Sequence, residues 1–252
     1  MGVYKIYEKY LFRQIKKGPM PRHIGIILDG NRRWALSRSL PKELGHEVGA
    51  KVAEKYLEWI KDLGIKITTL YVLSTENLLR EKKELDHLFK IIEERLERLL
   101  LDERIHKYKV RVKGLGRFEL LPSRIREILK KLEEATAEYN EYYLNIAIAY
   151  GGRQEIVDGV RRIAEKVKKG LMEPEDINQR VIEENLYTSF LPIQEPDMII
   201  RTSGEERLSG FLIWQSAYSE LIFLDVYWPD FRKIDLMRCI RIYQKRNRRF
   251  GR

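Results

Sequence analysis

The chain has 252 residues and a formal net charge of +10, from 48 Lys and Arg and 38 Asp and Glu side chains. This length suits one large domain with a sizeable core. No apolar stretch approaches the roughly 20 residues of a membrane-spanning helix. A single cysteine, Cys239, excludes an internal disulfide and fits the cytoplasm. The basic balance suits nucleic acid, an anionic membrane or a phosphorylated substrate. Nucleic acid is disfavoured, because no helix-turn-helix, zinc-finger or RNA-platform pattern is present.

Residues 3–16 are predicted to form a basic amphipathic helix, followed by a break at Pro21. Its apolar side chains at helical spacing are Tyr4, Tyr7, Tyr10 and Leu11. Two interpretations stay open: the helix packs on the domain's own surface, or it contacts anionic lipid at the inner face of the membrane. We therefore expect an N-terminal helix in residues 1–20 and the main domain in residues 21–252.

Strands and helices alternate through the rest of the chain. The predicted strands are the run that ends at Asp29 and residues 65–73, 110–113, 144–149, 198–201 and 222–226. The predicted helices are residues 45–63, 83–101, 123–139, 155–169, 174–186 and 234–248. This alternation predicts an α/β fold, with a mostly parallel sheet covered by helices on both faces in a single domain.

The most informative stretch is residues 23–35, in which an apolar run ends in Asp29, Gly30 and Asn31 and then turns cationic. Parallel α/β proteins bind ligands at the carboxyl ends of their strands. Asp29 could hold a divalent cation there, and Arg33 could neutralise an anion. As an exposed turn carboxylate, Asp29 would matter for activity but little for stability. A haloacid-dehalogenase-type phosphatase would also begin this way, but it needs a second aspartate where Asn31 stands.

Five segments in order carry a resemblance to a known family. They are residues 23–35, Ser74-Thr75-Glu76-Asn77, Tyr150-Gly151-Gly152-Arg153, Arg201-Thr202-Ser203-Gly204-Glu205 and Trp228-Pro229-Asp230-Phe231. From about Pro21 to Gly251 the chain resembles the cis-prenyltransferases, the undecaprenyl (polyprenyl) diphosphate synthase family. The resemblance implies condensation of isopentenyl diphosphate with an allylic diphosphate, farnesyl or geranylgeranyl. The product would be a long-chain cis-polyprenyl diphosphate for glycan carriers, and it would grow in an apolar tunnel.

The resemblance also assigns the site. Breaking the allylic carbon–oxygen bond gathers charge on the diphosphate, which Mg²⁺ and cationic side chains would stabilise. Asp29 would bind the metal, and Asn77 would position the diphosphate or assist proton removal. The other residues assigned to substrate binding on these segments are Gly30, Asn31, Arg32, Arg33, Trp34, Lys42, His46, Ser74, Thr75, Glu76 and Arg80.

A second set would hold isopentenyl diphosphate. It consists of Arg201, Arg207 and Ser209, whose guanidinium and hydroxyl groups suit a diphosphate. Glu220 would complete the metal site with Asp29. The tail Arg249-Phe250-Gly251 matches the arginine-any-glycine ending that, in this family, reaches a diphosphate across a homodimer, with Arg249 and Gly251 as its matching residues.

Some positions depart from the bacterial pattern. Arg32 replaces a common glycine, Lys42 an arginine, Leu78 a tryptophan, Ala149 an asparagine and Glu206 a histidine. These changes predict an archaeal or eukaryote-like member and leave the starter and the chain length open.

Other classes of protein are less consistent with the sequence. Trans-type prenyl synthases need aspartate-rich motifs, and this chain has no adjacent aspartate pair. A non-catalytic or short-chain partner subunit of a heteromeric prenyltransferase would typically lose Asp29 and its neighbours, which are present. We therefore expect a catalytic homodimer.

Overall fold

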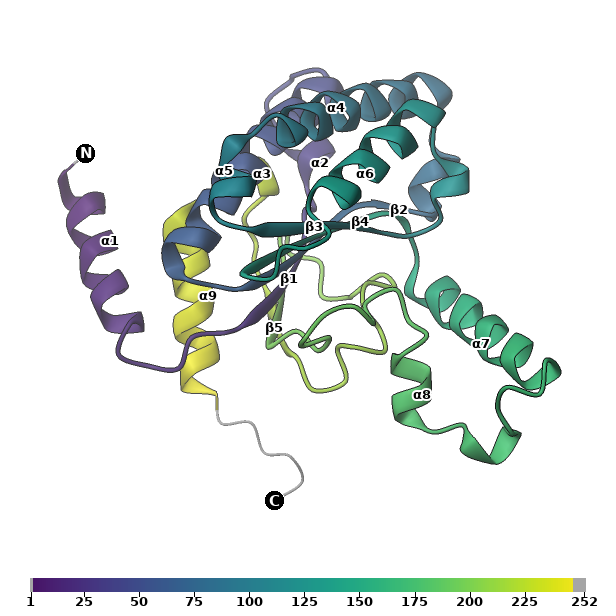
Figure 1. The fold of residues 1–252 in the computed structure, drawn as a ribbon. Coiled ribbons are helices and arrows are strands. Elements are labelled where there is room, and N and C mark those ends of the chain that lie inside the picture. The colour runs from purple at the N-terminus through teal and green to yellow at the C-terminus, as the bar shows by residue number, and fades with distance from the viewer. Residues whose placement is uncertain (1, 247–252) are drawn as a thin grey trace.

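A six-stranded parallel sheet forms the centre of the protein in the computed structural model, which describes residues 2–246 (Figure 1). The strands are β1 His23–Ile27, β2 Ile67–Ser74, β3 Val110–Leu115, β4 Tyr142–Tyr150, β5 Met198–Arg201 and β6 Glu220–Phe223. Their order in the sheet is β3-β4-β2-β1-β5-β6, and each neighbouring pair is parallel. The predicted α/β fold class is confirmed.

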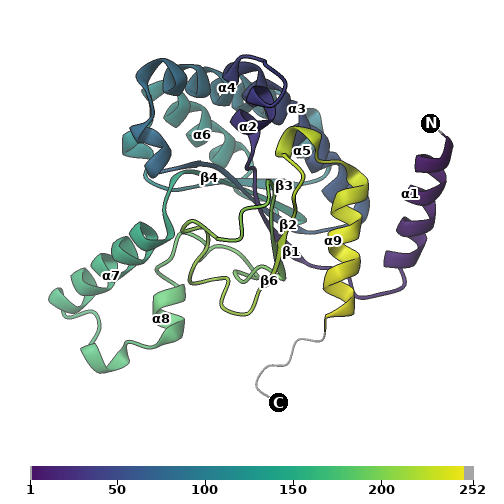
Figure 2. The same ribbon diagram turned by 180° about the vertical axis from the view of Figure 1, so that it is seen from behind.

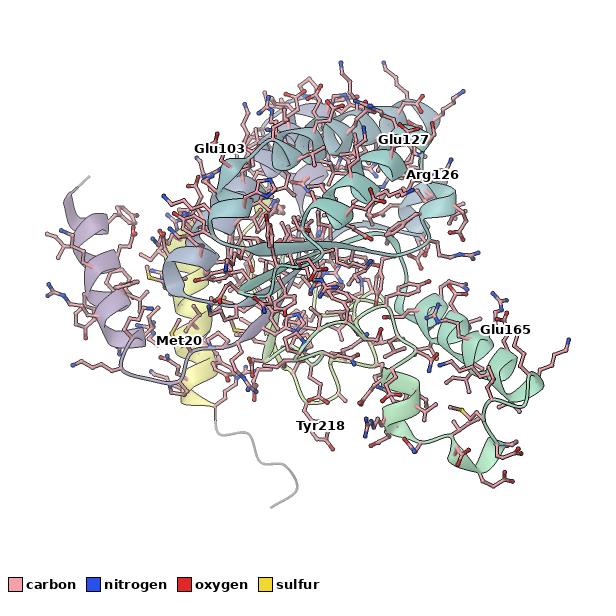
Figure 3. All side chains as sticks on the ribbon, in the orientation of Figure 1. Met20, Glu103, Arg126, Glu127, Glu165 and Tyr218 are labelled. Carbon is pink, nitrogen blue, oxygen red and sulfur yellow. The ribbon has the colours of Figure 1, made fainter. Side chains whose placement is uncertain are left out.

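Helices connect these strands. The α-helices are α1 Gly2–Ile15, α2 Asn31–Leu36, α3 Lys42–Leu63, α4 Lys82–Leu100, α5 Glu103–Lys107, α6 Ser123–Ala135, α7 Gly152–Lys168, α8 Gln179–Glu183 and α9 Lys233–Lys245. The 3₁₀ helices are η1 Glu76–Leu79, η2 Phe118–Leu120, η3 Pro174–Asp176 and η4 Trp228–Asp230. Charged side chains on exposed helix faces, such as Arg126, Glu127 and Glu165, project into solvent (Figure 3).

Besides shifts of up to four residues at the ends of other elements, one predicted helix and one predicted strand differ from the structure. The single helix expected at 174–186 is broken into η3 and α8, because extended Asn178 caps α8 by accepting a hydrogen bond from the Val181 amide at 3.2 Å. The strand expected at 222–226 instead spans Glu220–Phe223. This difference shifts Glu220 from a loop into the first position of a strand.

Both faces of the sheet are buried, so its strands alternate between two apolar clusters. Ile26 belongs to the larger cluster, with side chains from α3, α4 and α6, whereas its neighbour Ile27 faces the smaller cluster around Phe211 and Leu212. Helices α3, α4 and α6 lie over one face, and the irregular chain after α8 lies under the other (Figures 1 and 2).

The chain reverses its direction of travel across the sheet at β1. Strand β2 pairs with one edge of β1, and β5, far later in the chain, pairs with the other edge. The register places Ile27 beside Arg201, so the loops that follow β1 and β5 leave the same end of the sheet together. Such a switch point leaves a crevice at the carboxyl ends of the strands, which is where α/β proteins bind ligands.

Helix α1 packs beside α9 at one side of the domain (Figure 2). Leu11 and Ile15 are fully buried in the main core, and the Gln244 amide donates a hydrogen bond to the Ile15 carbonyl at 2.7 Å. The opposite face of the helix, with Ile6 and Tyr10, is exposed. The first interpretation of this segment, packing on the domain, therefore describes one of its two faces.

Replacing Leu11 with Ala should lower the free energy of unfolding by about 2–5 kcal/mol, because the change leaves a cavity in a fully buried position. Denaturant unfolding measures this loss, and Ile6→Ser on the exposed face is the matched control. A Leu11 variant as stable as the control would show that α1 is not part of the core.

Candidate active site

Asp29 lies just beyond the end of β1, at the switch point of the sheet. Its Oδ2 accepts hydrogen bonds from Arg201 Nη2 at 2.7 Å and Nε at 3.3 Å, and its Oδ1 accepts one from Arg33 Nη2 at 3.2 Å. Burial alone would raise the pKa of Asp29, but bonding and charge from Arg201 and then Arg33 outweigh burial and lower the pKa. The carboxylate is therefore held ionised.

The expectation of an exposed Asp29 is wrong. Its side chain is 26% exposed, and its partner Arg201 is only 5% exposed. Removing one member of a buried ion pair leaves the other without a counter-charge, which is costly. We therefore expect loss of the Asp29 carboxylate to lower the stability of the protein.

The two sets of diphosphate residues meet in one cluster. Arg33 donates to Glu205 Oε1 at 2.6 Å, and Glu205 also pairs with Arg207. Arg201 donates to Ser209 Oγ at 2.9 Å and to the carbonyl of Arg207. Asp29 and Glu205 thus each join residues that the sequence assigned to different substrates. Glu205 lies in one of the five segments that carry the family resemblance, but no role was predicted for it.

The loop after β5 owes its shape to strained and close-packed residues. Ser203 and Ser209 both have positive φ, at 80° and 48°, an uncommon conformation for non-glycine residues. The Tyr71 hydroxyl donates to the Ser209 carbonyl at 3.3 Å, and the Gly152 amide donates to the Gly210 carbonyl at 2.8 Å. The Tyr150-Gly151-Gly152-Arg153 motif therefore helps to position the loop that carries Arg207 and Ser209.

Asn31, the first residue of α2, packs closely against α3. A Cβ at Gly45 would lie 2.1 Å from the Asn31 carbonyl oxygen, and one at Gly49 would lie 2.0 Å from its Oδ1. Both helical glycines are thus required for this close approach. Gly30 has φ of 103°, and a Cβ there would lie 2.7 Å from Tyr227, so glycine is needed for the turn itself.

A third cluster surrounds Glu84, which the sequence did not single out. Its Oε1 lies 2.9 Å from Arg80 Nη1, 3.7 Å from Arg32 Nε and 3.8 Å from His46 Nε2. Burial and then the charge of Arg80 lower the pKa of His46 to about 4, so this imidazole is neutral at neutral pH. The spacing of four residues between Arg80 and Glu84 was the sequence signal that could have found this pair.

Ser74 and Asn77 bond reciprocally at the end of β2. The Asn77 backbone amide donates to Ser74 Oγ, and the Ser74 backbone amide donates to Asn77 Oδ1, both at 3.2 Å. The Thr75 backbone amide donates to the Tyr150 carbonyl at 3.0 Å, while Glu76 is exposed. Asn77 is therefore held as a turn former, and its Nδ2 group is the part of the side chain that can serve a ligand.

Four of the assigned residues lie apart from this charged cluster or outside the described residues. Trp34 donates from Nε1 to Asp230 Oδ1 at 2.8 Å and stacks under Arg38. Lys42 is the first residue of α3. Arg249 and Gly251 fall outside the described residues.

The predicted pairing of Glu220 with Asp29 in one metal site is wrong within a single chain. Glu220 pairs in register with Met198, which pairs with Ile24, at the amino end of the strands. Asp29 follows the carboxyl end, five residues after Ile24 or roughly 16 Å at the usual rise of a strand. Glu220 instead accepts a hydrogen bond from Arg246 Nη1 at 2.8 Å.

Asp29 can still hold a metal by shared coordination. Among residues 2–246, no group of three or more His, Cys, Asp or Glu side chains is placed to bind an ion on its own. Mg²⁺ in phosphate-binding sites commonly takes one or two carboxylates, with substrate oxygens and water completing its shell. A single partly exposed carboxylate among arginines that suit a diphosphate fits that donor set.

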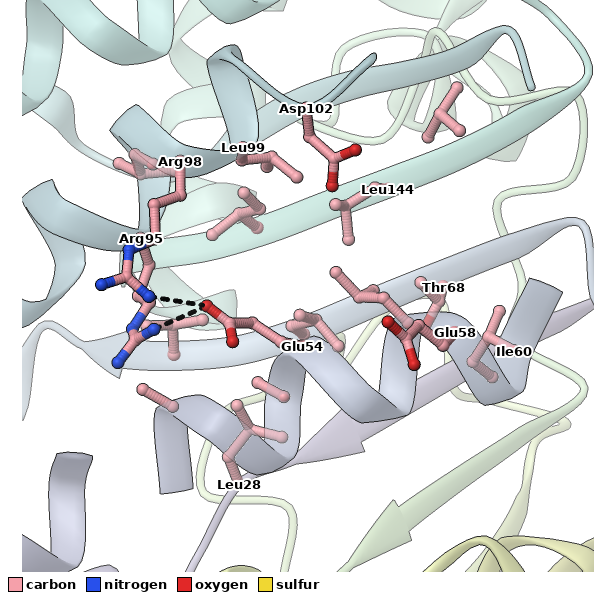
Figure 4. Close-up of a pocket in the computed structure, with 18 of the residues that line it drawn as sticks. Leu28, Glu54, Glu58, Ile60, Thr68, Arg95, Arg98, Leu99, Asp102 and Leu144 are labelled. Atoms are coloured by element: carbon pink, nitrogen blue, oxygen red, sulfur yellow. Dashed lines mark hydrogen bonds and ion pairs between the residues drawn. The ribbon is translucent and has the colours of Figure 1, made fainter. Parts of the chain in front are cut away.

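An apolar cavity of about 510 Å³ begins beside this site. Asn31 and His46 line one end, and apolar side chains of α3, α4, β2 and β4 line its length. Charged residues occupy one side and the far end: Glu54 faces Arg95 and Arg98, and Glu58 and Asp102 lie further along (Figure 4). Arg104 bonds to both Glu58 and Asp102 there.

Replacing Gly49 with Ala should displace Asn31, because the added carbon would lie 2.0 Å from its Oδ1. Misplacing a group of an active site by about 1 Å can lower the reaction rate by up to roughly 100-fold. We expect the affinity for inorganic pyrophosphate, measured by calorimetry, to fall by at least roughly tenfold. Lys51→Ala on the exposed face of α3 is the control, and equal affinities in both variants would contradict this close packing.

Comparisons with known proteins identify the family of this chain. A family model described as "Putative undecaprenyl diphosphate synthase" matches residues 27–251. A tritrans,polycis-undecaprenyl-diphosphate synthase (geranylgeranyl-diphosphate specific) from Methanocaldococcus jannaschii is 53% identical over 250 residues, covering 99% of this chain and 89% of that protein. A protein of the same name from Methanopyrus kandleri is 56% identical over 250 residues, with coverage of 99% and 92%.

Solved structures agree as well. Lavandulyl diphosphate synthase from Lavandula x intermedia, in complex with dimethylallyl diphosphate, matches with a TM-score of 0.89 and 34% identity, covering 92% of this chain and 99% of that one. A probable undecaprenyl diphosphate synthase from Campylobacter jejuni matches with a TM-score of 0.74 and 29% identity, covering 93% and 100%. The chain therefore belongs to the undecaprenyl diphosphate synthase family, in its archaeal type, and is a prenyltransferase.

Proposed function

We propose that this protein extends geranylgeranyl diphosphate with isopentenyl diphosphate units to a long cis-polyprenyl diphosphate that serves as a glycan-carrier precursor. The observation that carries the proposal is the fusion of two guanidinium sets around Asp29 at the mouth of an apolar cavity. The relatives from Methanocaldococcus and Methanopyrus, both more than half identical, carry the geranylgeranyl specificity in their names.

The residues of the site suit each event of this reaction. The allylic carbon–oxygen bond breaks and its electron pair leaves with the diphosphate. The double bond of isopentenyl diphosphate then forms the new carbon–carbon bond, and a proton is lost from that unit. Arg33 and the backbone around Gly30 would hold the departing diphosphate, while Arg201, Arg207 and Ser209 would orient isopentenyl diphosphate. Asn77 would position the reacting end through its amide.

A divalent metal, Mg²⁺ in our proposal, would share Asp29 with the diphosphate and neutralise the charge of the leaving group. In this account the N–H groups of Arg33 and Arg201 donate to the diphosphate when it binds, and each arginine then releases one carboxylate oxygen of Asp29. The same pairs keep Asp29 ionised, which metal binding requires. Glu220 has no part in this proposal.

The cavity between the sheet and helices α3 and α4 would be the tunnel for the growing chain. Its lining of leucine, isoleucine and valine suits a hydrocarbon, and its near end lies beside Asn31 and His46. We also propose a homodimer with residues 21–252 as the catalytic part. The support for the dimer and for the role of Arg249 and Gly251 is the sequence resemblance.

The exposed face of α1 supports peripheral binding of the protein to the inner face of an anionic membrane. Among the described residues, no helix is long and apolar enough to cross a bilayer. Ile6 and Tyr10 are 70% and 61% exposed, and the exposed Lys9 and Arg13 share their face at helical spacing. Exposed apolar and basic residues on one helix face suit an interface with anionic lipid.

The enzymatic proposal is tested with labelled isopentenyl diphosphate and geranylgeranyl diphosphate in Mg²⁺. The Asp29→Asn variant should lose turnover and also unfold at a lower temperature, because Arg201 loses its counter-charge.

Arg207→Ala should raise the KM of isopentenyl diphosphate by roughly 10- to 150-fold, and the KM of the starter far less. Equal effects on both substrates would mean that the two sets are wrongly assigned, and an active Asp29→Asn protein would refute the role of the carboxylate.

Filling the cavity should shorten the product. Ala53, on α3, lines the cavity, so Ala53→Phe would place an aromatic ring in the path of the chain. We expect shorter products by chromatography, with the first condensation nearly unchanged. Leu171→Phe, at an exposed position remote from the cavity lining, should leave product length unchanged. Full-length product from Ala53→Phe would show that the chain grows elsewhere.

The membrane proposal requires surface substitutions, because Leu11 and Ile15 of the same helix belong to the core. The double variant Ile6→Ser, Tyr10→Ser should bind anionic vesicles more weakly and release long product more slowly, while keeping its thermal stability. Leu171→Ser removes a similarly exposed apolar side chain elsewhere and serves as the control. If the double variant bound vesicles as tightly as the control, α1 would only pack against the domain and would not contact the membrane.

A further inference from the structure

Nitrogen atoms from three different segments approach one atom, Oε1 of Glu84. Arg32 belongs to α2, His46 to α3, and Arg80 follows η1, whereas Glu84 lies in the first turn of α4. The Glu84 side chain is only 11% exposed and that of His46 only 10%. A carboxylate on α4 thus ties together segments that the chain keeps apart.

The cluster holds more donor capacity than one oxygen can accept. Only Arg80 lies within hydrogen-bond distance of Oε1, at 2.9 Å, while Arg32 and His46 stand 3.7 Å and 3.8 Å away. The buried Nε2 of His46 has no hydrogen-bond partner among the described residues. Buried polar atoms are rarely left unpaired, so an orphaned atom indicates a ligand or water that completes it. The surplus donors suit an anion larger than a carboxylate.

The position of the cluster identifies that anion. His46 lines the near end of the apolar cavity, and Arg32 precedes Arg33, which bonds to Asp29. A diphosphate whose hydrocarbon tail enters the cavity would place its head between these groups. The anion is therefore the diphosphate of the allylic starter, an inference that rests on the proposed function.

We propose that Glu84 is a positioning residue that gathers Arg80 and Arg32 around the diphosphate of the allylic starter. Glu84 does not touch the substrate in this account; it fixes the guanidinium group of Arg80, whose remaining N–H groups then face the anion. Burial lowers the pKa of Arg80, and Glu84 opposes this effect as its largest favourable charge. Without the carboxylate, Arg80 would lose the partner that holds it at this partly buried position.

Arg32 stands where the bacterial pattern has glycine, so this chain has one more guanidinium group at the site. A second guanidinium beside Arg80 adds like charge, which one shared carboxylate can moderate. Glu84 therefore allows two arginines to stand near one phosphate before the substrate arrives. Preorganised donors need little rearrangement when charge develops on that phosphate.

The test compares Glu84→Gln with the wild type and with Glu81→Gln, an exposed residue three positions earlier with the same change in charge. We expect Glu84→Gln to raise the KM of geranylgeranyl diphosphate and the Kd of inorganic pyrophosphate by roughly tenfold. The KM of isopentenyl diphosphate should change little, and Glu84→Asp should recover part of the loss. Glu81→Gln should match the wild type in all of these values.

A charge effect alone would have the opposite sign, because removing a negative charge near an anion site tightens anion binding. Unchanged or tighter pyrophosphate binding in a folded Glu84→Gln protein would therefore overturn the proposal. In the Arg80→Ala background, Glu84→Gln should cost little more if it acts through Arg80, and a fully additive loss would also overturn it.

The outcome is separable from that of the proposed function. If the wild type neither binds pyrophosphate nor incorporates isopentenyl diphosphate, the proposed function itself fails. If the wild type does both and Glu84→Gln behaves like Glu81→Gln, only the role of Glu84 fails. A thermal melt of each variant excludes unfolding as the cause of a weaker Kd.

Discussion

The ion pair between Asp29 and Arg201 is the interaction on which the site depends. It joins the ends of β1 and β5, which are neighbours in the sheet, although Asp29 and Arg201 lie 172 positions apart in the chain. Arg201 is buried, so it needs this carboxylate as its counter-charge, and the arginine in turn lowers the pKa of the half-buried Asp29 carboxyl group. The sheet topology therefore fixes where the charges of the site meet.

The remaining charges follow one pattern, in which arginines that suit phosphate are each held by a carboxylate of the chain. The pairs are Asp29 with Arg33 and Arg201, Glu205 with Arg33 and Arg207, and Glu84 with Arg32 and Arg80. Clustered guanidinium groups would otherwise repel one another in a crevice of reduced dielectric constant. The arrangement keeps the groups in place for a multivalent anion, which offers them more charge and more acceptors than a carboxylate.

The sequence was sufficient to predict the fold class, most of the strands and the residues around Asp29, because local apolar patterns and contiguous motifs encode them. It could not predict that Asp29 and Arg201 form a pair, since that contact depends on strand order. The position of Glu220 relative to Asp29 within one chain was missed for the same reason: a motif gives a residue's neighbours in the chain but not the end of the sheet at which it lies. The break between η3 and α8 was missed because Asn178 caps the second helix locally.

Glu84 shows a further limit of sequence reasoning. Its spacing from Arg80 predicts a helical ion pair of small value at a surface. Only the packing of α2 and α3 against α4 brings Arg32 and His46 to the same oxygen. The functional weight of the residue therefore comes from tertiary contacts, whereas the residues in the quoted motifs were visible in the chain itself.

The pKa of the Asp29 carboxyl group, followed by carbon-13 NMR without divalent metal, tests the central interaction most directly. The account predicts a pKa below the usual value in the wild type, and a clear rise in a folded Arg201→Ala variant, because burial then acts with less opposition. An ordinary pKa in the wild type, or one that does not change when Arg201 is removed, would contradict it.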